Sequence, residues 1–268
     1  MKTLMAMYGK AGDIVMSMWA ASLIREKTGV PPSLLVAPQF HAIACVLRDS
    51  LEMPIDSVIC EKSACPLRDR AVAGSFMASW SEGFLRERHP GFKRYFNCSL
   101  PCEAPEASHM AAFIAYLGGV CPSPFVPPSI PWAPRPSETK RRAVFHFGAS
   151  DPRRHIRIEM KPLEMECVCV GGPRDPAPDW IDEDLRGLSL EQTVEEIRKS
   201  AVMVGSDSLM THLSGVAGVP TACFHATPRE ESTYSRTAYA NGVSLLAAAE
   251  GIVNPMLVRE AVCRRLQV

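Results

Sequence analysis

The stretch Ser200–Pro228, SAVMVGSDSLMTHLSGVAGVPTACFHATP, decides the fold that we predict for this chain of 268 residues. The apolar run Ala201–Val204 is typical of a buried strand, and it ends in the polar turn Gly205-Ser206-Asp207-Ser208. Apolar residues then recur at helical spacing until Gly218-Val219-Pro220, and Thr221–Phe224 predicts a second buried strand. Strand, turn, helix and strand form a βαβ unit, so we expect an α/β fold.

Asp207 and Ser208 lie at the predicted carboxyl end of a strand, where open α/β sheets bind their ligands. The first turn of the following helix offers backbone N–H groups and the positive end of its dipole to an anion. Ser and Asp are also favoured as ordinary helix N-caps. The turn alone therefore supports an anion site and a structural cap equally.

Two further stretches combine glycine with polar residues after an apolar start. Met7–Val15 reads MYGKAGDIV, and Val144–Ser150 reads VFHFGAS. Together with SDSLMTHLSGVAGVPT, these motifs resemble the heptosyltransferase family, inverting enzymes of glycosyltransferase family 9 with the GT-B fold. Their order and rough spacing match the family over most of the chain. The resemblance implies two Rossmann-like α/β domains that face each other across a cleft.

Composition bounds the class of protein. Hydrophobic residues make up 47% and charged residues 22%, so the chain can bury a sizeable core. Because 29 basic residues balance 29 acidic ones, we expect no duplex nucleic acid partner, although a local charged patch is compatible with this balance. No apolar run reaches the ~18 residues that span a bilayer. Peripheral membrane association and the oligomeric state stay open.

The ten cysteines are expected to be reduced thiols of a cytoplasmic protein, because no secretory signal precedes the first predicted strand. Four of them invite a zinc interpretation: Cys60, Cys65, Cys98 and Cys102. Their spacings, C-x4-C and C-x3-C, lie outside the tight C-x2-C pairs of zinc sites. We therefore expect no structural zinc and no disulfide.

A proline-rich segment predicts the domain boundary. Seven prolines between Pro122 and Pro136 exclude a helix and suit an extended linker. We therefore predict an N-terminal domain over residues 1–136 and a C-terminal domain over residues 137–268. In the first, strands are expected at Lys2–Tyr8, Ser33–Ala37 and Ser57–Cys60, and helices at Ile14–Lys27, His41–Leu47, Ser75–Arg88 and Glu106–Leu117. In the second, strands are expected at Arg142–Phe147 and Met165–Val170, and helices at Leu190–Lys199, Ala247–Ile252 and Pro255–Leu266.

Other nucleotide-binding signatures are missing. Gly9-Lys10 lacks the spacing of a P-loop, and no G-x-G-x-x-G fingerprint occurs. A run of basic and aromatic residues over residues 86–96 is compatible with an acceptor site for a phosphorylated or sugar-rich substrate. A solvated helix end with its loop is the more common explanation of such a run.

The residues expected to bind a nucleotide-sugar donor come from three places. In Gly148-Ala149-Ser150, small side chains let backbone N–H groups approach phosphate oxygens, and Arg fits phosphate geometry in a fork. The family carries a Lys near this position, and here either Arg153 or Arg154 takes its place. The resemblance also assigns Gly172, Asp175, Asp207, Ser208 and His212 to the donor. Asp175 and His212 have ordinary structural interpretations too, and Leu209 departs from the glycine that most relatives carry.

The resemblance makes Asp13 the general base that accepts the proton of the acceptor hydroxyl. Gly12 and Lys10 are expected to lie beside the acceptor, and Gly9 and Gly12 to permit a tight turn. Asp13 is also suited to cap a helix from Ile14. GT-B enzymes generally work without a bound metal, so neither a metal nor a cofactor is expected.

These predictions converge on an inverting, metal-independent glycosyltransferase. It would move a heptose or related sugar from a nucleotide diphosphate, with an ADP-sugar favoured, to an acceptor hydroxyl in surface glycan synthesis. Two alternatives stay open: a GT-B protein that binds a nucleotide or sugar without turnover, and a transferase that acts on a nucleobase or a protein.

Overall fold

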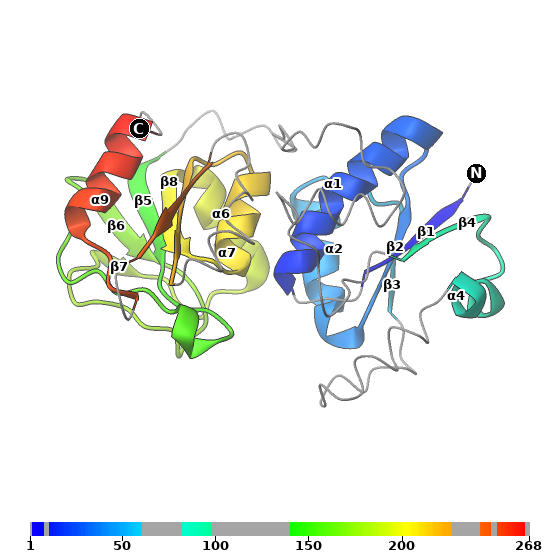
Figure 1. Cartoon of the computed structure of the whole chain (residues 1–268), viewed down its shortest axis with the longest axis horizontal. Coiled ribbons are helices and arrows are strands. Elements are labelled where there is room, and N and C mark those ends of the chain that lie inside the picture. The colour runs from blue at the N-terminus through cyan, green and yellow to red at the C-terminus, as the bar shows by residue number, and fades with distance from the viewer. Residues whose placement is uncertain are drawn as a thin grey trace. The chain divides into compact units, whose positions relative to one another are not determined.

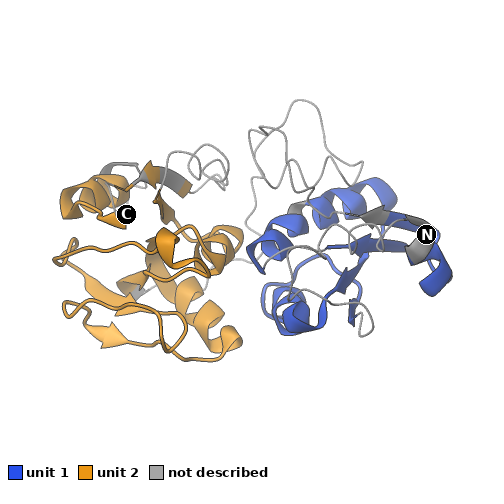
Figure 2. Ribbon diagram, turned by 60° about the horizontal axis from the view of Figure 1, so that its bottom comes forward, with its two compact units in different colours: residues 1–126 blue, residues 127–268 orange. Residues whose placement is uncertain are grey.

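The computed structural model describes residues 2–7, 11–60, 82–97, 140–226, 242–247 and 251–265. The chain divides into two compact units, Met1–Val126 and Pro127–Val268, which Figure 2 colours blue and orange. The proline-rich segment and the predicted boundary after residue 136 lie outside the described residues, as does the predicted helix Glu106–Leu117.

The N-terminal unit is built on a four-stranded parallel sheet with the order β3-β2-β1-β4 (Figure 1). Its strands are β1 (Thr3–Ala6), β2 (Ser33–Val36), β3 (Val58–Cys60) and β4 (Arg94–Asn97). Its described helices are α1 (Ala11–Thr28), α2 (His41–Ser50) and α4 (Glu82–Arg88), with a 3-10 turn at Pro38–Phe40. The predicted β-α-β start is therefore confirmed, with boundaries shifted by a few residues.

The start of α1 corrects one expectation. The helix begins at Ala11, so Gly12 and Asp13 lie in its first turn and not in a loop before it. Asp13 consequently cannot be the N-cap of a helix that starts at Ile14. As the acidic residue of the first turn, it still lies where the helix dipole favours a negative charge.

The basic and aromatic run folds into α4 and β4, a strand that the sequence did not predict. The Tyr95 hydroxyl donates to the carbonyl oxygens of His89 and Phe92 at 2.8 and 2.9 Å. The Arg86 guanidinium lies over the Tyr95 ring, 5.2 Å from its centroid. Tyr95 thus joins the helix to the strand, which favours a structural role for this aromatic residue.

The C-terminal unit contains a six-stranded sheet, again with every neighbouring pair parallel, in the order β10-β9-β8-β5-β6-β7. Its strands are β5 (Lys140–His146), β6 (Glu166–Cys169), β7 (Glu183–Asp184), β8 (Ser200–Ser206), β9 (Thr221–His225) and β10 (Gly242–Leu246). Its described helices are α6 (Leu190–Lys199), α7 (Leu209–Val216) and α9 (Pro255–Glu260), followed by a π-helical turn at Ala261–Arg265. A 3-10 turn spans Pro152–Arg154.

This strand order fixes where a ligand site can form. Counted along the unit, the six strands run 3-2-1-4-5-6 across the sheet, the doubly wound order of Rossmann folds. The first strand, β5, and the fourth, β8, are neighbours at the centre, and the chain winds away from them in opposite directions. Their carboxyl ends therefore flank the topological switch point, where open α/β sheets bind ligands.

One hydrophobic core cluster of this unit lies between the sheet and α9. Figure 1 shows α9 on one side of the strands and α6 and α7 on the other. Phe145 and Phe147 stack at 5.8 Å between ring centroids, and Trp180 meets Phe145 edge-on at 5.1 Å. The Trp180 indole donates to the Ile158 carbonyl at 2.8 Å, so its one polar atom is satisfied. The α/β class is thus confirmed in both units.

Local sequence explains the start of α6 but fails near the carboxyl terminus. Ser189 caps α6, and Ser189 and Gln192 form a reciprocal capping box. The helix expected at Ala247–Ile252 is wrong at both of its ends, because Ala247 follows strand β10 and Ile252 forms a parallel bridge with Arg157. Residues 248–250 lie outside the described residues.

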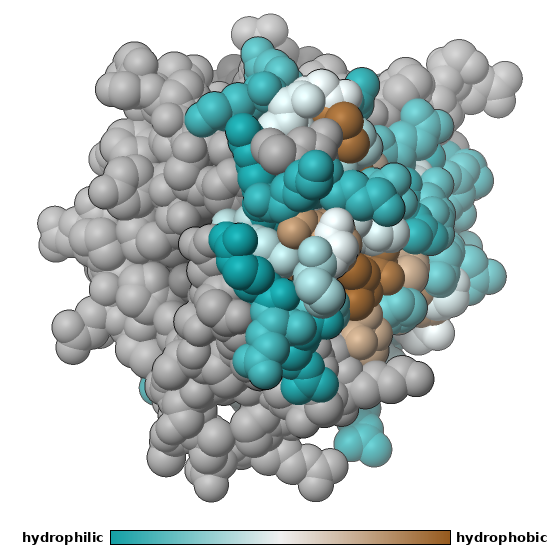
Figure 3. All heavy atoms as spheres, turned by 90° about the vertical axis from the view of Figure 1, so that its right-hand side faces the viewer, coloured by the Kyte–Doolittle hydropathy of each residue, from teal (hydrophilic) through white to brown (hydrophobic). Residues whose placement is uncertain are grey.

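The coloured residues on the face shown in Figure 3 are mostly hydrophilic, with hydrophobic side chains gathered in one small area. Across the described residues, the large hydrophobic side chains that are exposed are Val30, Met160 and Met256. None of the helices described here combines the length and the apolar character needed to cross a membrane.

A buried arginine yields a stability prediction. Arg142, on β5, is 2% exposed, and its guanidinium bonds to the Glu196 carboxylate and to the Ser200 hydroxyl. Glu196→Ala leaves this buried cation without its main partner and is expected to lower the free energy of unfolding by about 3 kcal/mol. Glu195→Ala is the matched control, because Glu195 is 46% exposed and pairs with Lys199 along the helix surface. The Glu195→Ala change should lower the free energy of unfolding by less than about 1 kcal/mol. Equal losses for the two variants in urea denaturation would contradict the assignment.

Candidate functional site

Polar side chains gather at the switch point of the C-terminal sheet. His146 is the last residue of β5, and Asp207 and Ser208 follow the end of β8. Asp175 lies in the turn after β6, the neighbour of β5. Strands that are parallel end at the same edge of the sheet, so four side chains from distant parts of the chain meet there.

His146 connects two of the predicted donor residues. Its Nε2 lies 3.1 Å from Asp175 Oδ2, and its Nδ1 lies 2.9 Å from Ser208 Oγ. A carboxylate only accepts, so Nε2 carries the proton, and in the neutral ring Nδ1 then accepts the hydroxyl proton of Ser208. The hydrogen bond from His146 is the main cause that holds the pKa of Asp175 below its usual range, and the Gly172 N–H at 2.7 Å adds to it. Asp175, His146 and Ser208 thus form one connected network.

Two glycines leave room for this network. A Cβ on Gly148 would overlap the Asp175 carboxyl group. At Gly171, where φ is +137°, a Cβ would lie 2.5 Å from Asp175 Oδ2 and 2.8 Å from His146 Cδ2. The turn Gly148-Ala149-Ser150, which we call the GAS turn, therefore needs glycine at position 148 so that Asp175 can pack closely against it. This need is separate from any role of the glycine in the approach to a ligand.

A second network is centred on Asp207. The Arg154 guanidinium bonds to Asp207 Oδ2, and both side chains are largely buried, at 18% and 2% exposed. His212, one turn into α7, places Nε2 3.4 Å from Asp207 Oδ1. The structure thus brings together three residues that the sequence assigned to the donor site.

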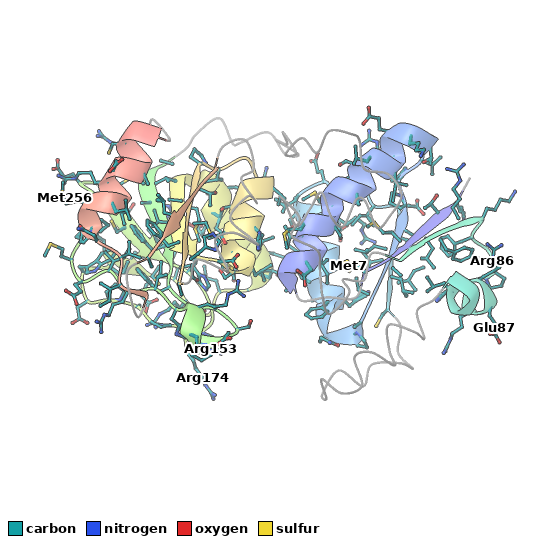
Figure 4. All side chains as sticks on the ribbon, in the orientation of Figure 1. Met7, Arg86, Glu87, Arg153, Arg174 and Met256 are labelled. Atoms are coloured by element: carbon teal, nitrogen blue, oxygen red, sulfur yellow. The ribbon has the colours of Figure 1, made fainter. Side chains whose placement is uncertain are left out.

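The two candidate arginines differ clearly in position. The side chain of Arg153 is 86% exposed and pairs with Asp151, whereas Arg154 points inward to Asp207. In Figure 4 Arg153 and Arg174 are labelled at the margin of the C-terminal unit, Arg174 extending away from it. Arg154 is therefore the one of the pair that lies in the site, although its binding of phosphate stays a prediction.

The remaining predicted residues lie either around these networks, in the other unit, or outside the described residues. Ala149 accepts a hydrogen bond from His155 Nε2 at 3.1 Å, and Ser150 is exposed. Asp13 and Gly12 lie in the first turn of α1, at the carboxyl end of β1, and are half-buried. Lys10 and Gly9 lie outside the described residues, so the acceptor assignments stay predictions. The same holds for the expected absence of metal, since Cys65, Cys98 and Cys102 are also outside them.

Sequence reasoning missed two histidines of the site. His146 was read only as part of a motif, and His225, the last residue of β9, was not singled out. His225 is fully buried, and neither ring nitrogen has a hydrogen-bond partner among the described residues. Burial, followed by nearby His212 and Arg154, lowers the pKa of His225 to about 4, so the ring is neutral. The signal that could have identified them is their place in the fold: each histidine is the last residue of a strand that neighbours β8.

The fold defined by these sheets is that of a known class, the heptosyltransferases and family 9 glycosyltransferases. Neither a scan against models of protein families nor a search of curated protein sequences gives a match. Solved structures do match over almost their whole length, which confirms the resemblance at the level of the fold.

Three of these structures are named here. Escherichia coli heptosyltransferase WaaC with ADP matches with a TM-score of 0.65 at 12% identity, covering 98% of this chain and 99% of that one. E. coli ADP-heptose lps heptosyltransferase II matches with a TM-score of 0.67 at 14% sequence identity, covering 100% of this chain and 99% of that one. A family 9 glycosyltransferase from Veillonella parvula matches with a TM-score of 0.65 at 12% sequence identity, covering 99% of this chain and 96% of that one.

The packing around Asp175 predicts the effect of a single methyl group. Gly148→Ala is expected to destabilise the protein by about 1–3 kcal/mol, because its Cβ would overlap the Asp175 carboxyl group. Gly172→Ala is the matched control, since its Cβ would lie 3.5 Å from Asp175 Oδ2, an ordinary contact. Thermal unfolding of both variants measures the difference. A Gly148→Ala melting temperature no lower than that of Gly172→Ala would contradict this packing.

Proposed function

We propose that the protein is an inverting glycosyltransferase that moves a sugar from an ADP-sugar to an acceptor hydroxyl. The observation that carries this proposal is the joint position of Arg154, Asp207, Ser208 and His212 at the switch point of a heptosyltransferase fold. One matching structure, that of E. coli heptosyltransferase WaaC, contains ADP. In this proposal the two units face each other across a cleft, as GT-B domains do.

The diphosphate is assigned to Arg154 and the GAS turn. A guanidinium carries five N–H donors in a fixed fork, so it can bond Asp207 and a phosphate oxygen together. The bond to Asp207 orients this fork in advance, which lowers the entropy lost on binding. Ser208 and the backbone of Gly148-Ala149-Ser150 would supply further donors. Stabilising the leaving diphosphate as its charge grows is the main electrostatic task of such a site.

The two carboxylates of the site are assigned different parts of the donor. Asp207, whose Oδ2 holds Arg154, would position His212 to bind hydroxyl groups of the transferred sugar. Asp175 would bind the ribose, and because its Oδ2 already accepts from His146 and Gly172, the ribose would be left to Oδ1. His146 positions both Asp175 and Ser208 in this scheme.

The transfer step needs one base and no covalent intermediate. The acceptor oxygen attacks the anomeric carbon while the bond from that carbon to the diphosphate oxygen breaks, and the anomeric configuration inverts. Asp13 takes the proton of the attacking hydroxyl, and ADP leaves with the bonding electrons. Gly12 and Lys10 would lie beside the acceptor, for which a surface glycan precursor in the cytoplasm is the proposed class.

Leu209 favours a second candidate, a protein that binds the donor without turnover. Most relatives place glycine there, and in this chain Leu209 is the first residue of α7, directly after Ser208. A side chain at this point limits how closely the backbone approaches a ligand. Binding of an ADP-sugar with no transfer to any acceptor would support this candidate over the transferase.

The two arginines provide a test of the donor site. Arg154→Ala is expected to weaken ADP binding about 10- to 100-fold, the value of one or two charge-assisted hydrogen bonds. Arg153→Ala is the control, and it should leave the affinity within about twofold because its side chain is 86% exposed. Isothermal titration calorimetry measures both. Arg154→Lys, which keeps a charge beside Asp207, separates lost phosphate binding from a disturbed fold, and equal affinities of wild type and Arg154→Ala would refute the placement.

The general base is tested by Asp13→Asn, which keeps the size of the side chain and removes its proton acceptor. Sugar transfer should fall by roughly 10²-fold or more while ADP affinity and folding stay unchanged. Glu26→Gln, an exposed site near the other end of α1, should transfer at the wild-type rate. The assay must follow sugar on a real acceptor, because slow hydrolysis of the donor uses water. Transfer by Asp13→Asn at the wild-type rate would remove this residue from catalysis.

A further inference from the structure

A group of metal-ligand side chains lies beneath the Asp207 network. Asp207, Cys223 and His225 each offer one ligand atom, and these atoms all lie within 4.8 Å of one another. The three side chains are buried, with Asp207 at 2%, Cys223 at 5% and His225 at 0% exposed. Carboxylate oxygen, thiol sulfur and imidazole nitrogen thus meet in one enclosed place.

The pairing of β9 with β8 creates this group. Alternate residues of a strand point to opposite faces, and Ala222 and Phe224 belong to the core on the α9 side. Cys223 and His225 therefore share the opposite face, which α7 covers. Asp207 joins them because its N–H donates to the Phe224 carbonyl at 3.3 Å, which holds the end of β8 beside the end of β9.

His225 is the observation that points to a missing ligand. Buried polar groups in folded proteins almost always have a hydrogen-bond partner, and exceptions call for an explanation such as an ion. Within the part of the chain that the structure describes, both nitrogens of His225 lack one, and Asp207 Oδ1, 3.4 Å from His212 Nε2, also makes no hydrogen bond. His146, another buried histidine of this edge, has partners on both of its nitrogens. His225 and Asp207 Oδ1 thus both belong to the group that also contains Cys223.

We propose that Asp207, Cys223 and His225 bind one zinc ion. The ligands would be Asp207 Oδ1, the Cys223 thiolate and one nitrogen of His225, with the fourth position left to a water molecule or another group. Binding forms three metal–ligand bonds and releases the thiol proton to solvent, with no change of oxidation state. This proposal does not depend on the proposed sugar transfer.

The donor set selects the metal class. Zinc takes four ligands and accepts S, N and O donors together, whereas Ca²⁺ and Mg²⁺ need about six oxygens. Only one carboxylate is present in the group, which disfavours those two ions. Arg154 holds Asp207 through Oδ2, so it orients the carboxylate from outside as hydrogen-bond partners of metal ligands commonly do.

The charge balance is also compatible with zinc. Arg154 and Asp207 together are neutral. Adding Zn²⁺ and removing one thiol proton raises the local charge by one unit. This departs from the expectation of no metal, which rested on cysteine spacing and could not reveal a Cys-x-His pair on one strand face.

Zinc binding to the full chain tests the proposal. After removal of bound metal with a chelator and dialysis, titration with Zn²⁺ alone should show one site per chain by calorimetry and elemental analysis. Loss of a hydrogen-bond partner of a ligand costs about 10- to 100-fold in affinity, so Cys223→Ala and His225→Phe should each cost at least about 100-fold. Co²⁺ in place of zinc should give a thiolate charge-transfer absorption that Cys223→Ala abolishes.

The control and the fallback measurement separate this site from other thiols. Cys169→Ala removes another buried cysteine, on β6, and should bind zinc as the wild type does. If a variant does not fold, anomalous scattering at the zinc edge from wild-type crystals locates the ion directly. The proposal is overturned if the wild type binds no stoichiometric zinc, if both variants still bind it, or if the anomalous peak lies elsewhere. None of these readouts uses a nucleotide or a sugar, so their failure is distinct from failure of the proposed transferase.

Discussion

The parallel pairing of β5 with β8 is the constraint on which the C-terminal unit depends. It joins residues about 60 positions apart in sequence, with His146 opposite Gly205. A Cβ on Gly205 would lie 2.9 Å from the His146 carbonyl oxygen, so glycine permits the close approach of these two strand ends. Because β5 and β8 are neighbours, the chain winds to both sides, and the ends of β5, β6, β8 and β9 converge at one edge. Every polar contact of the candidate site follows from this convergence.

Local sequence was sufficient where a pattern and its partner lie close together in the chain. The strand, turn, helix and strand of residues 200–225 were predicted almost to the residue, because each segment carries its own periodicity and its own stop signal. Prediction failed for β4 and β10, whose pairing partners β1 and β9 decide their conformation. The alanine-rich stretch from Ala247 favours a helix locally, yet the Ala247 N–H donates to the His225 carbonyl beside the sheet. Long-range pairing outweighed intrinsic propensity there.

The site was predictable in part for the same reason. Asp207, Ser208 and His212 lie on one turn and the helix after it, so motif spacing identified them together. The choice between Arg153 and Arg154 could not be made from sequence, because two adjacent arginines differ only in which one turns toward β8. His146 and His225 were missed because a histidine at a strand end has no local signature. Its meaning depends on which strand lies beside it, and that is a property of the strand order.

Asp207 links the two proposals made for this edge of the sheet. Its Oδ2 holds Arg154, the proposed phosphate ligand, and its Oδ1, which lies 3.4 Å from His212 Nε2, is the proposed zinc ligand. A zinc ion with a Cys223 thiolate would change the local charge by one positive unit, and a diphosphate brings negative charge to the same carboxylate network. In a buried environment the added positive charge of the zinc site and the negative charge of the diphosphate attract each other. This attraction favours tighter binding of each ligand in the presence of the other. By thermodynamic linkage the factor by which zinc changes ADP affinity must equal the factor by which ADP changes zinc affinity. The Asp207 carboxylate, with Arg154 on one oxygen and zinc on the other, is therefore sufficient to couple the proposed diphosphate site to the proposed zinc site.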